Sequence, residues 1–422
     1  MNFFENYIFR WLSIILVWTA VDADAFTPPG RFRESSTLVG NRLYFFGSQI
    51  IAQQRDNIYL DVTLSTLNTT NPSWFMLIPI PAKFLLASSC VGGPNKNTIY
   101  LLNHLTTSND YSNDTIVYAF DTEAATWSTP NISGQIPLSR QQFQAVNDTN
   151  GKIYMFGGTQ FHNISISSEV IFNDIYILDT LNLTWTQGSN VNAPTPRVDF
   201  TATLLNNGLI LYIGGTVGVG IIYMSEIPTY NTNNNSWNTI FAIGDTLNSR
   251  SCHTAVLSPD GHIIIYGGGI RDSTDQSQVL ASLDTTVNPY KWSIKPMIGS
   301  NLPPSLKYHS SDIVGNFMIL AFGVMMANNS FLNLTNVNSK IYLLDTRNYT
   351  WVTSTSTSPN SSHPQNPTVT QIQTVYSNSL STGVIVAIPL VLIAVLVIAG
   401  FTGYWFYKKK KQNDIIRISG SI

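Results

Sequence analysis

A tryptophan recurs along this chain of 422 residues at intervals of 52 to 59 residues. The six positions are Trp74, Trp127, Trp185, Trp237, Trp292 and Trp351. Each tryptophan follows an apolar run that ends in an acidic or amide residue, and an earlier apolar run approaches a glycine step. Self-similarity at a nearly constant period indicates a repeat architecture. The sequence therefore predicts six copies of one structural unit.

The third copy shows the unit most clearly. Residues 151–158 (Gly-Lys-Ile-Tyr-Met-Phe-Gly-Gly) have the pattern of a strand that ends in a double glycine, and residues 173–180 have that of a second strand. Trp185 stands six residues after Asp179. A further short strand precedes each glycine step and is opened by Arg31, Lys83, Arg140, Arg197, Arg250 or, in the sixth copy, Leu306. Three residues later come Glu34, Leu86, Phe143, Phe200, His253 and His309.

These runs are short, β-branched and aromatic, and no helical periodicity lies between them. Each copy thus predicts four strands. A single four-stranded sheet cannot bury both of its faces, whereas several sheets packed radially can do so. We therefore predict an all-β fold with one small sheet for each repeat, and structural roles for most of the recurring residues.

The combination of Arg-x-x-His/Phe, an apolar run, Gly-Gly, Tyr-x-x-Asp and Trp resembles the kelch repeat. The resemblance covers about residues 31 to 352, with a worn second copy that lacks both glycines. Proteins of this family fold as β-propellers with one repeat for each blade, so the resemblance implies a six-bladed kelch-type β-propeller. All six copies are complete without sharing a strand. Residues 368–375 are a candidate for an added closing strand, although a stalk is favoured there.

The two ends of the chain have the patterns of a membrane-anchored protein. Residues 1–25 resemble a secretory signal peptide, with a short apolar core and Ala23-Asp24-Ala25 as the cleavage site. Residues 383–407 are long and apolar enough for one membrane span, and Lys408 to Lys411 follow it. The alternative, a glycolipid-anchor signal, normally ends in an apolar tail. We expect a single-pass type I protein of the cell membrane.

This organisation assigns residues 26–352 to the propeller, 353–382 to a stalk rich in Ser, Thr, Asn and Pro, and 408–422 to a cytosolic tail. The propeller is then extracellular, or luminal within the secretory pathway. Eleven Asn-x-Ser/Thr sequons predict glycosylation. They are at Asn68, Asn113, Asn131, Asn147, Asn163, Asn182, Asn234, Asn328, Asn333, Asn348 and Asn360.

The chain contains two cysteines, Cys90 and Cys252. They fall in the second and fifth copies, which face each other across a ring of six. A disulfide requires Cα atoms within about 7 Å of each other, so we predict two unpaired, buried thiols. The near balance of 22 basic and 24 acidic residues gives no sign of nucleic-acid binding.

No metal-ligand spacing is apparent among the six histidines and two cysteines, and we expect no cofactor. The glycine-rich residues 214–220 lack the Lys-Ser/Thr of a phosphate loop. Galactose oxidase and related copper radical oxidases also carry kelch repeats. Their copper is held by two tyrosines and two histidines, one tyrosine being cross-linked to a cysteine. Part of that site comes from a domain after the propeller that is missing here.

Function in such scaffolds belongs to the loops. The longest loops follow the glycine steps, at residues 159–172, 216–225, 269–278 and 324–339. Their candidate contact residues are Phe161, Ile221, Ile222, Tyr223 and Phe331. We predict a non-catalytic binding or adhesion scaffold for an extracellular protein or glycan. The alternatives are a galactose-oxidase-like copper oxidase of carbohydrates or alcohols and a structural glycoprotein without a discrete ligand.

Overall fold

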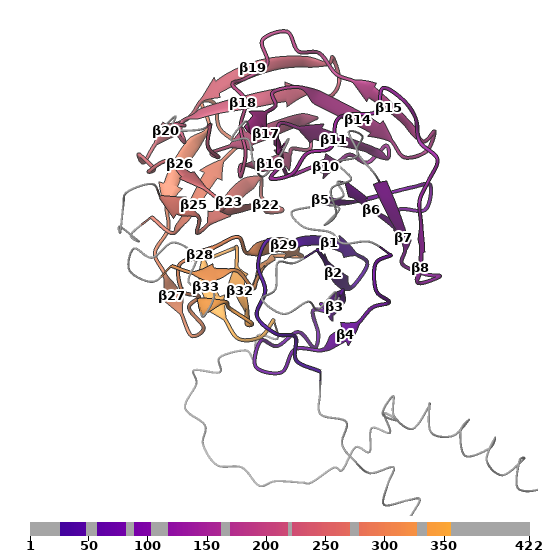
Figure 1. The fold of residues 1–422 in the computed structure, drawn as a ribbon. Coiled ribbons are helices and arrows are strands. Elements are labelled where there is room, and N and C mark those ends of the chain that lie inside the picture. Colours follow the sequence, from indigo (N-terminus) through magenta and orange to yellow (C-terminus); the bar gives the residue numbers. More distant parts are fainter. Residues whose placement is uncertain are drawn as a thin grey trace, which may run out of the picture. The chain divides into compact units, whose positions relative to one another are not determined.

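The computed structural model describes residues 26–47, 57–81, 88–102, 117–161, 169–217, 222–270, 278–326 and 336–355. The regular elements in these ranges are β-strands, and they form six antiparallel blades around a common axis (Figure 1). The predicted all-β, six-bladed propeller is confirmed. It belongs to a compact unit that runs from Ala25 to Pro359.

The first three blades contain β1 to β15. Blade 1 consists of β1 (Ser35–Val39), β2 (Arg42–Phe46), β3 (Ile58–Asp61) and β4 (Trp74–Met76). Blade 2 consists of β5 (Ser88–Gly92), β6 (Thr98–Leu102), β7 (Val117–Asp121) and β8 (Thr126–Ser128). Blade 3 consists of β10 (Val146–Asn147), β11 (Lys152–Phe156), β14 (Ile175–Asp179) and β15 (Thr184–Gln187), with β9 (Ser133–Gly134) added in parallel to β15.

The other three blades repeat this plan. Blade 4 consists of β16 (Thr201–Leu204), β17 (Leu209–Ile213), β18 (Glu226–Asn231) and β19 (Ser236–Phe241). Blade 5 consists of β22 (Thr254–Leu257), β23 (His262–Tyr266), β25 (Leu280–Asp284) and β26 (Lys291–Ile294), with β20 (Ile243–Gly244) in parallel. Blade 6 consists of β29 (Ser310–Val314), β30 (Phe317–Ala321), β32 (Ile341–Asp345) and β33 (Thr350–Val352), with β27 (Ile298–Gly299) in parallel.

Short two-stranded sheets extend three of the blades beyond their glycine steps. They pair β12 (Thr159–Phe161) with β13 (Glu169–Ile171), β21 (Arg250–Ser251) with β24 (Gly269–Ile270), and β28 (Leu306–Lys307) with β31 (Val324–Met325). Four strands for each repeat were predicted, and the structure adds the parallel strands β9, β20 and β27 at the blade edges. These additions come from the chain that crosses from one blade to the next.

The repeated tryptophan packs between neighbouring blades. Trp292 is 1% exposed, and its indole Nε1 donates a hydrogen bond to the carbonyl oxygen of Met224 at 2.9 Å. Trp237 Nε1 donates to the carbonyl oxygen of Ser189, which follows the fourth strand of blade 3, at 2.7 Å. These two tryptophans therefore bury a large apolar surface and also pair a backbone carbonyl of the preceding blade.

The double glycine is needed because two blades meet at it. In blade 5, a Cβ on Gly267 would lie 2.9 Å from Cε1 of His309 in blade 6, and a Cβ on Gly268 would lie 2.7 Å from Cβ of His253. Both glycines also have positive φ angles, of 65° and 91°. A side chain at either position would clash and strain the backbone. The basic residue of the repeat supports this step, since Arg250 Nη1 donates to the carbonyl of Gly267 at 3.3 Å.

Among the described residues, the two ends of the propeller meet without exchanging a strand. After β33 the chain runs alongside a loop of blade 1: the Thr69 N–H donates to the Thr353 carbonyl at 2.8 Å, and the Thr355 N–H donates to Leu67 at 3.2 Å. Residues 368–375, the candidate closing strand, lie outside the described residues.

The expected signal peptide, membrane span and cytosolic tail also lie outside the described residues, as does the stalk beyond residue 355. Within the described ranges, no helix has the length and hydropathy required to cross a bilayer.

Candidate binding site at the mouth of the central channel

The first strands of the blades enclose a central cavity of about 510 Å³. Its lining is rich in hydroxyl, amide and acidic side chains, among them Ser36, Ser89, Gln144, Thr203 and Asp312. A cavity of this size is within the range of small-ligand sites. The first and second strands of each blade are antiparallel. The segment before the first strand and the glycine step after the second strand therefore lie at the same end of the channel, here called the mouth face.

Five residues at the mouth face are joined by a chain of backbone hydrogen bonds that runs from blade to blade. The N–H of Arg33 donates to Tyr308, Tyr308 to Cys252, Cys252 to Asp199, and Asp199 to Gln142. The four N···O distances lie between 2.9 and 3.1 Å. These five residues, one from each of five blades, are called the mouth ring. The corresponding segment of blade 2 falls within residues 82–87, which are not described.

Every member of the mouth ring has a left-handed backbone. The φ angles are 61° for Arg33, 60° for Gln142, 54° for Asp199, 59° for Cys252 and 55° for Tyr308. This conformation costs about 1–2 kcal/mol for a residue with a Cβ. The inter-blade hydrogen bonds hold the backbone there, and none of the five positions is a glycine. Their five different side chains are consequently kept at the rim of the cavity.

The mouth ring is chemically diverse. The guanidinium of Arg33 lies 4.2 Å from the ring centroid of Tyr308, and Gln142 Nε2 is 3.5 Å from Asp199 Oδ2. Burial raises the pKa of Cys252, which also has the hydroxyl of Tyr308 as a hydrogen-bonding neighbour. The ring thus combines a cation, an anion, an amide and an aromatic phenol, a set suited to polar and charged ligands.

A second layer lies just below the mouth ring, where the residue after each mouth-ring member enters a blade interface. His253 Nε2 is 3.2 Å from the Thr201 hydroxyl, and His309 Nε2 is 2.8 Å from the Thr254 hydroxyl. Burial lowers the pKa of His309 to about 3, so the imidazole is neutral at physiological pH. The two histidines thus link neighbouring blades through hydrogen bonds.

Glu34 takes the same place between blades 1 and 6. It is 8% exposed, and neither carboxylate oxygen is paired by a donor in the described residues. Burial raises its pKa to about 7, against the opposing effects of its own backbone, the Arg31 charge and the Ser310 hydroxyl. Burial also raises the pKa of Asp312 to about 7, although its carboxylate accepts a hydrogen bond from Ser36.

The candidate loop residues have different outcomes. Tyr223 is 65% exposed, and Phe241 is 67% exposed. The carbonyl of Tyr223 accepts the N–H of Glu226, and Glu226 pairs with Phe241 across the sheet. The two aromatic residues therefore lie near each other. Ile222 is 8% exposed, so the expectation that it is a surface contact is wrong: its side chain is buried. Phe161 ends β12, and its side chain is not described; Ile221 and Phe331 lie outside the described residues.

The sequence did not single out the mouth ring. Its members stand two residues after the basic residue of each repeat, or after Leu306, but their side chains have no common chemistry. Only their common position within the repeat could have identified them from the sequence. The two cysteines are free, as predicted. Cys90 is also buried as expected, whereas Cys252 is only half-buried.

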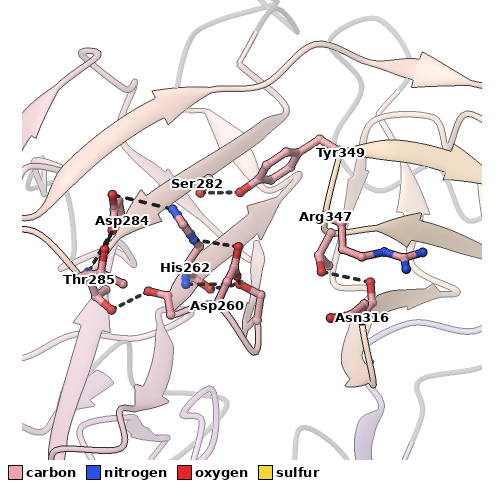
Figure 2. A network of polar contacts seen from close by, with 12 residues as sticks. Asp260, His262, Ser282, Asp284, Thr285, Asn316, Arg347 and Tyr349 are labelled. Atoms are coloured by element: carbon pink, nitrogen blue, oxygen red, sulfur yellow. Dashed lines mark hydrogen bonds and ion pairs between the residues drawn. The ribbon is translucent and has the colours of Figure 1, made fainter.

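Another polar cluster lies at the opposite face of the propeller, in blade 5 (Figure 2). His262 Nδ1 is 3.2 Å from Asp260 Oδ2, and Nε2 is 3.7 Å from Asp284 Oδ2. A hydrogen bond from Thr286 lowers the pKa of Asp284. The Tyr349 hydroxyl of blade 6 donates to the Ser282 hydroxyl at 2.9 Å. His262 joins two turns of blade 5 to each other, and Tyr349 joins blade 6 to β25 of blade 5, so the cluster has a structural role.

The repeats and the blade geometry agree with the comparison with known protein families. The family model described as the attractin/LZTR1 β-propeller matches residues 91–405. The chain belongs to this family. As an attractin/LZTR1-type propeller, it is 28% identical over 262 residues to Kelch domain-containing protein 3 of Mus musculus, across 57% of this chain and 64% of the relative. The kelch resemblance is thereby confirmed.

This attractin/LZTR1-type propeller is also 23% identical over 323 residues to acyl-CoA-binding domain-containing protein 5 of Arabidopsis thaliana, across 74% of this chain and 47% of the relative. The chain thus spans between about half and two thirds of the length of these two relatives. The solved structure of YjhT has a TM-score of 0.58 at 13% identity, with 77% of this chain and 98% of that chain covered. At this identity the likeness concerns the fold alone.

The copper of galactose-oxidase-like enzymes is held by tyrosine and histidine side chains. Tyr308 and Cys252 are neighbours at the mouth, but His253 and His309 direct Nε2 to threonine hydroxyls between blades. The described part of the chain has no group of three or more His, Cys, Asp or Glu side chains arranged to hold a metal. The hydrogen bonds of His253 and His309 to threonine thus differ from the ligand set of the copper-oxidase alternative.

Proposed function

We propose that this protein is a cell-surface glycoprotein whose propeller acts as a non-catalytic binding or adhesion scaffold for an extracellular protein or glycan. Membership in a kelch-type propeller family supports a binding role, since such propellers are typically protein-binding scaffolds. The signal-peptide pattern of residues 1–25 and the apolar stretch 383–407 support the location.

The observation that carries the proposal is the mouth ring. A rigid chain of backbone hydrogen bonds holds five unlike side chains at the rim of a polar cavity. Prior fixation of contact groups reduces the entropy lost on binding. Arg33, Asp199 and Tyr308 together favour a ligand with charged or hydrogen-bonding groups over a purely apolar one.

The test uses the full chain, tagged at its C-terminus and produced in a eukaryotic secretory host. A membrane-impermeant amine label should reach the propeller on intact cells. The detergent-solubilised protein is then screened against a glycan array and a panel of purified extracellular proteins. Binding should fall at least tenfold in Arg33→Asn and Asp199→Asn, because asparagine tolerates the left-handed backbone but removes the charge.

The matched control is Glu123→Gln, which removes one exposed charge from a turn on the opposite face. Its affinity should equal that of the wild type. The proposal would be refuted if the wild-type protein carried no surface label, or if Glu123→Gln lost as much binding as the two mouth variants. Metal analysis of the same preparation and an assay of alcohol oxidation examine the copper-oxidase alternative, which stoichiometric copper with turnover would favour.

A further inference from the structure

One turn recurs with the same sequence pattern in three blades. It connects the third and fourth strands and reads Asp/Asn-Thr-x-Asn-x-Thr/Ser-Trp, at residues 179–185, 231–237 and 345–351. Each copy contains a sequon, at Asn182, Asn234 and Asn348. The three asparagines therefore occupy one repeated structural position in blades 3, 4 and 6.

The same two contacts hold the turn in each blade. The side-chain oxygen of the first residue accepts the N–H two residues later, and the Thr hydroxyl donates to a carbonyl of the neighbouring turn. In blade 3, Asp179 accepts from Leu181 at 2.9 Å, and Thr180 donates to Gly151 at 2.6 Å. The matching threonine bonds are Thr232 to Gly208 at 2.9 Å and Thr346 to Asn316 at 3.0 Å. These contacts place each asparagine at the tip of the turn.

All three asparagines are exposed. The residue that follows each one is left-handed, with φ of 50° at Leu183, 56° at Asn235 and 55° at Tyr349. In blade 4 the hydroxyl of Ser236 donates to Asn234 Oδ1 at 2.6 Å, so that the two functional groups of the sequon are in contact. The strand directions place these tips on the face opposite the mouth ring.

The sequon at Asn147 differs from these three in its position and its exposure. Asn147 lies in β10, pairs with Ile153 of β11, and is half-buried as part of the lining of the channel. A bulky oligosaccharide on this side chain would obstruct the channel and the packing of the first strands. The structure thus separates sequons that the sequence alone treats as equal.

We propose that the repeated turn is a modification site, N-glycosylated at Asn182, Asn234 and Asn348, whereas Asn147 is not modified. The Nδ2 atom of each asparagine forms a bond to the anomeric carbon of an oligosaccharide carried on a polyprenyl diphosphate. The bond from that carbon to the diphosphate breaks, the polyprenyl diphosphate leaves, and the nitrogen releases one proton. This proposal rests on the proposed secretory location.

One N–H remains on each modified nitrogen. The hydrogen bond from Asn182 Nδ2 to Asp179 Oδ2, 2.8 Å long, can therefore persist after transfer. Glycans at these tips would cover three blades of the face opposite the mouth ring and leave the mouth ring itself accessible.

Blade 2 supplies a matched control, since its turn Asp121-Thr-Glu-Ala-Ala-Thr-Trp127 has the same spacing without a sequon. Asp121 accepts from Glu123 at 2.9 Å, Thr122 donates to Asn97 at 2.7 Å, and Ala125 has φ of 52°. The turn thus forms without the asparagine. Ala124→Asn creates a sequon in the same geometry, whereas Ala124→Gln adds a comparable amide without one.

The test uses the full chain from a eukaryotic secretory host. Peptide N-glycosidase in H2¹⁸O converts each glycosylated asparagine into ¹⁸O-labelled aspartate, which mass spectrometry locates. We expect label at 182, 234 and 348, none at 147, one additional labelled site in A124N, and none in A124Q at that position.

Surface-labelled protein with the three turns unmodified would overturn the proposal and leave the proposed function intact. Label at Asn147 in folded protein would also overturn it. Protein that neither reaches the surface nor carries any glycan would refute the location and this proposal together. If the three turns are glycosylated but the protein binds nothing on the glycan array or the protein panel, the result would count against the binding role alone.

Discussion

The N–H of Gly323 in the last blade donates a hydrogen bond of 2.8 Å to the carbonyl of Arg31, which precedes the first blade. The same bond joins Gly158 to Arg197, Gly215 to Arg250 and Gly268 to Leu306. The interface between the two ends of the propeller therefore uses the contact that links consecutive blades. This explains how the ring closes although no strand is exchanged between the terminal blades in the part of the chain that the structure describes.

Gly323→Ala should destabilise this interface. Its φ is 89°, and an added Cβ would lie 2.6 Å from His309 Cβ and 3.0 Å from that residue's Cα. Strain and overpacking together predict a loss of about 3 kcal/mol in the free energy of unfolding. Gly40→Ala is the control, because its φ is also positive but no atom lies within 4 Å of the added Cβ. Urea unfolding should show a loss of only about 1 kcal/mol there; equal losses would refute the steric account.

Stability should fall as the pH rises toward neutrality. Burial raises the pKa of Glu34 from its ordinary value of 4.5 to about 7, so the folded state binds the proton more tightly than the unfolded chain. Its stabilising contribution is complete below pH 4.5 and is lost as the pH rises through 7. At about 1.4 kcal/mol for each pH unit, the loss is about 3 kcal/mol.

Thermal unfolding between pH 4.5 and 8.5 measures this dependence. Glu34→Gln keeps a neutral amide in place of the carboxyl and should remove the share of the pH dependence due to Glu34, leaving the share due to Asp312, whose pKa burial also raises to about 7. Glu123→Gln, an exposed position, should leave the profile unchanged. An unaltered slope in Glu34→Gln would show that another group is responsible.

Two tryptophans differ in whether the indole nitrogen is paired. Trp292 Nε1 donates to Met224, whereas Trp351 Nε1 has no partner in the described residues, and both rings are at most 1% exposed. Trp→Phe removes a similar amount of ring surface at each position. At Trp292 it also leaves a buried carbonyl unpaired, which costs about 1–3 kcal/mol. Denaturant unfolding should therefore find Trp292→Phe the less stable variant, and the reverse order would contradict this reasoning.

The left-handed backbone of the mouth ring can be tested at Gln142, whose φ is 60°. Gln142→Gly relieves the strain but increases the entropy of the unfolded chain, so we expect stability within about 1 kcal/mol of the wild type. Gln142→Val places a β-branched residue in the same conformation, and we expect it to be about 2 kcal/mol less stable than Gln142→Gly. Chemical denaturation of the two variants gives the difference. Equal stabilities would mean that the ring relaxes on substitution.

Residues close together in the sequence made the blades predictable. Trp185 follows Asp179 by six residues in the same pattern as in other copies, and the glycine pair 157–158 ends a strand visible in the same segment. The burial of Ile222 was not predictable in this way, because it depends on what the loop packs against. The signal peptide, membrane span and cytosolic tail remain predictions from composition.

By itself, the sequence determined the number of blades and the four strands of each, because one local pattern is repeated six times. Only the tertiary structure decided which side chains form the mouth. Arg33, Tyr308, Cys252, Asp199 and Gln142 come from different blades, and consecutive members are 53 to 57 residues apart except where the ring closes. Their proximity results from the closure of six sheets around one axis, a long-range arrangement that no single repeat encodes.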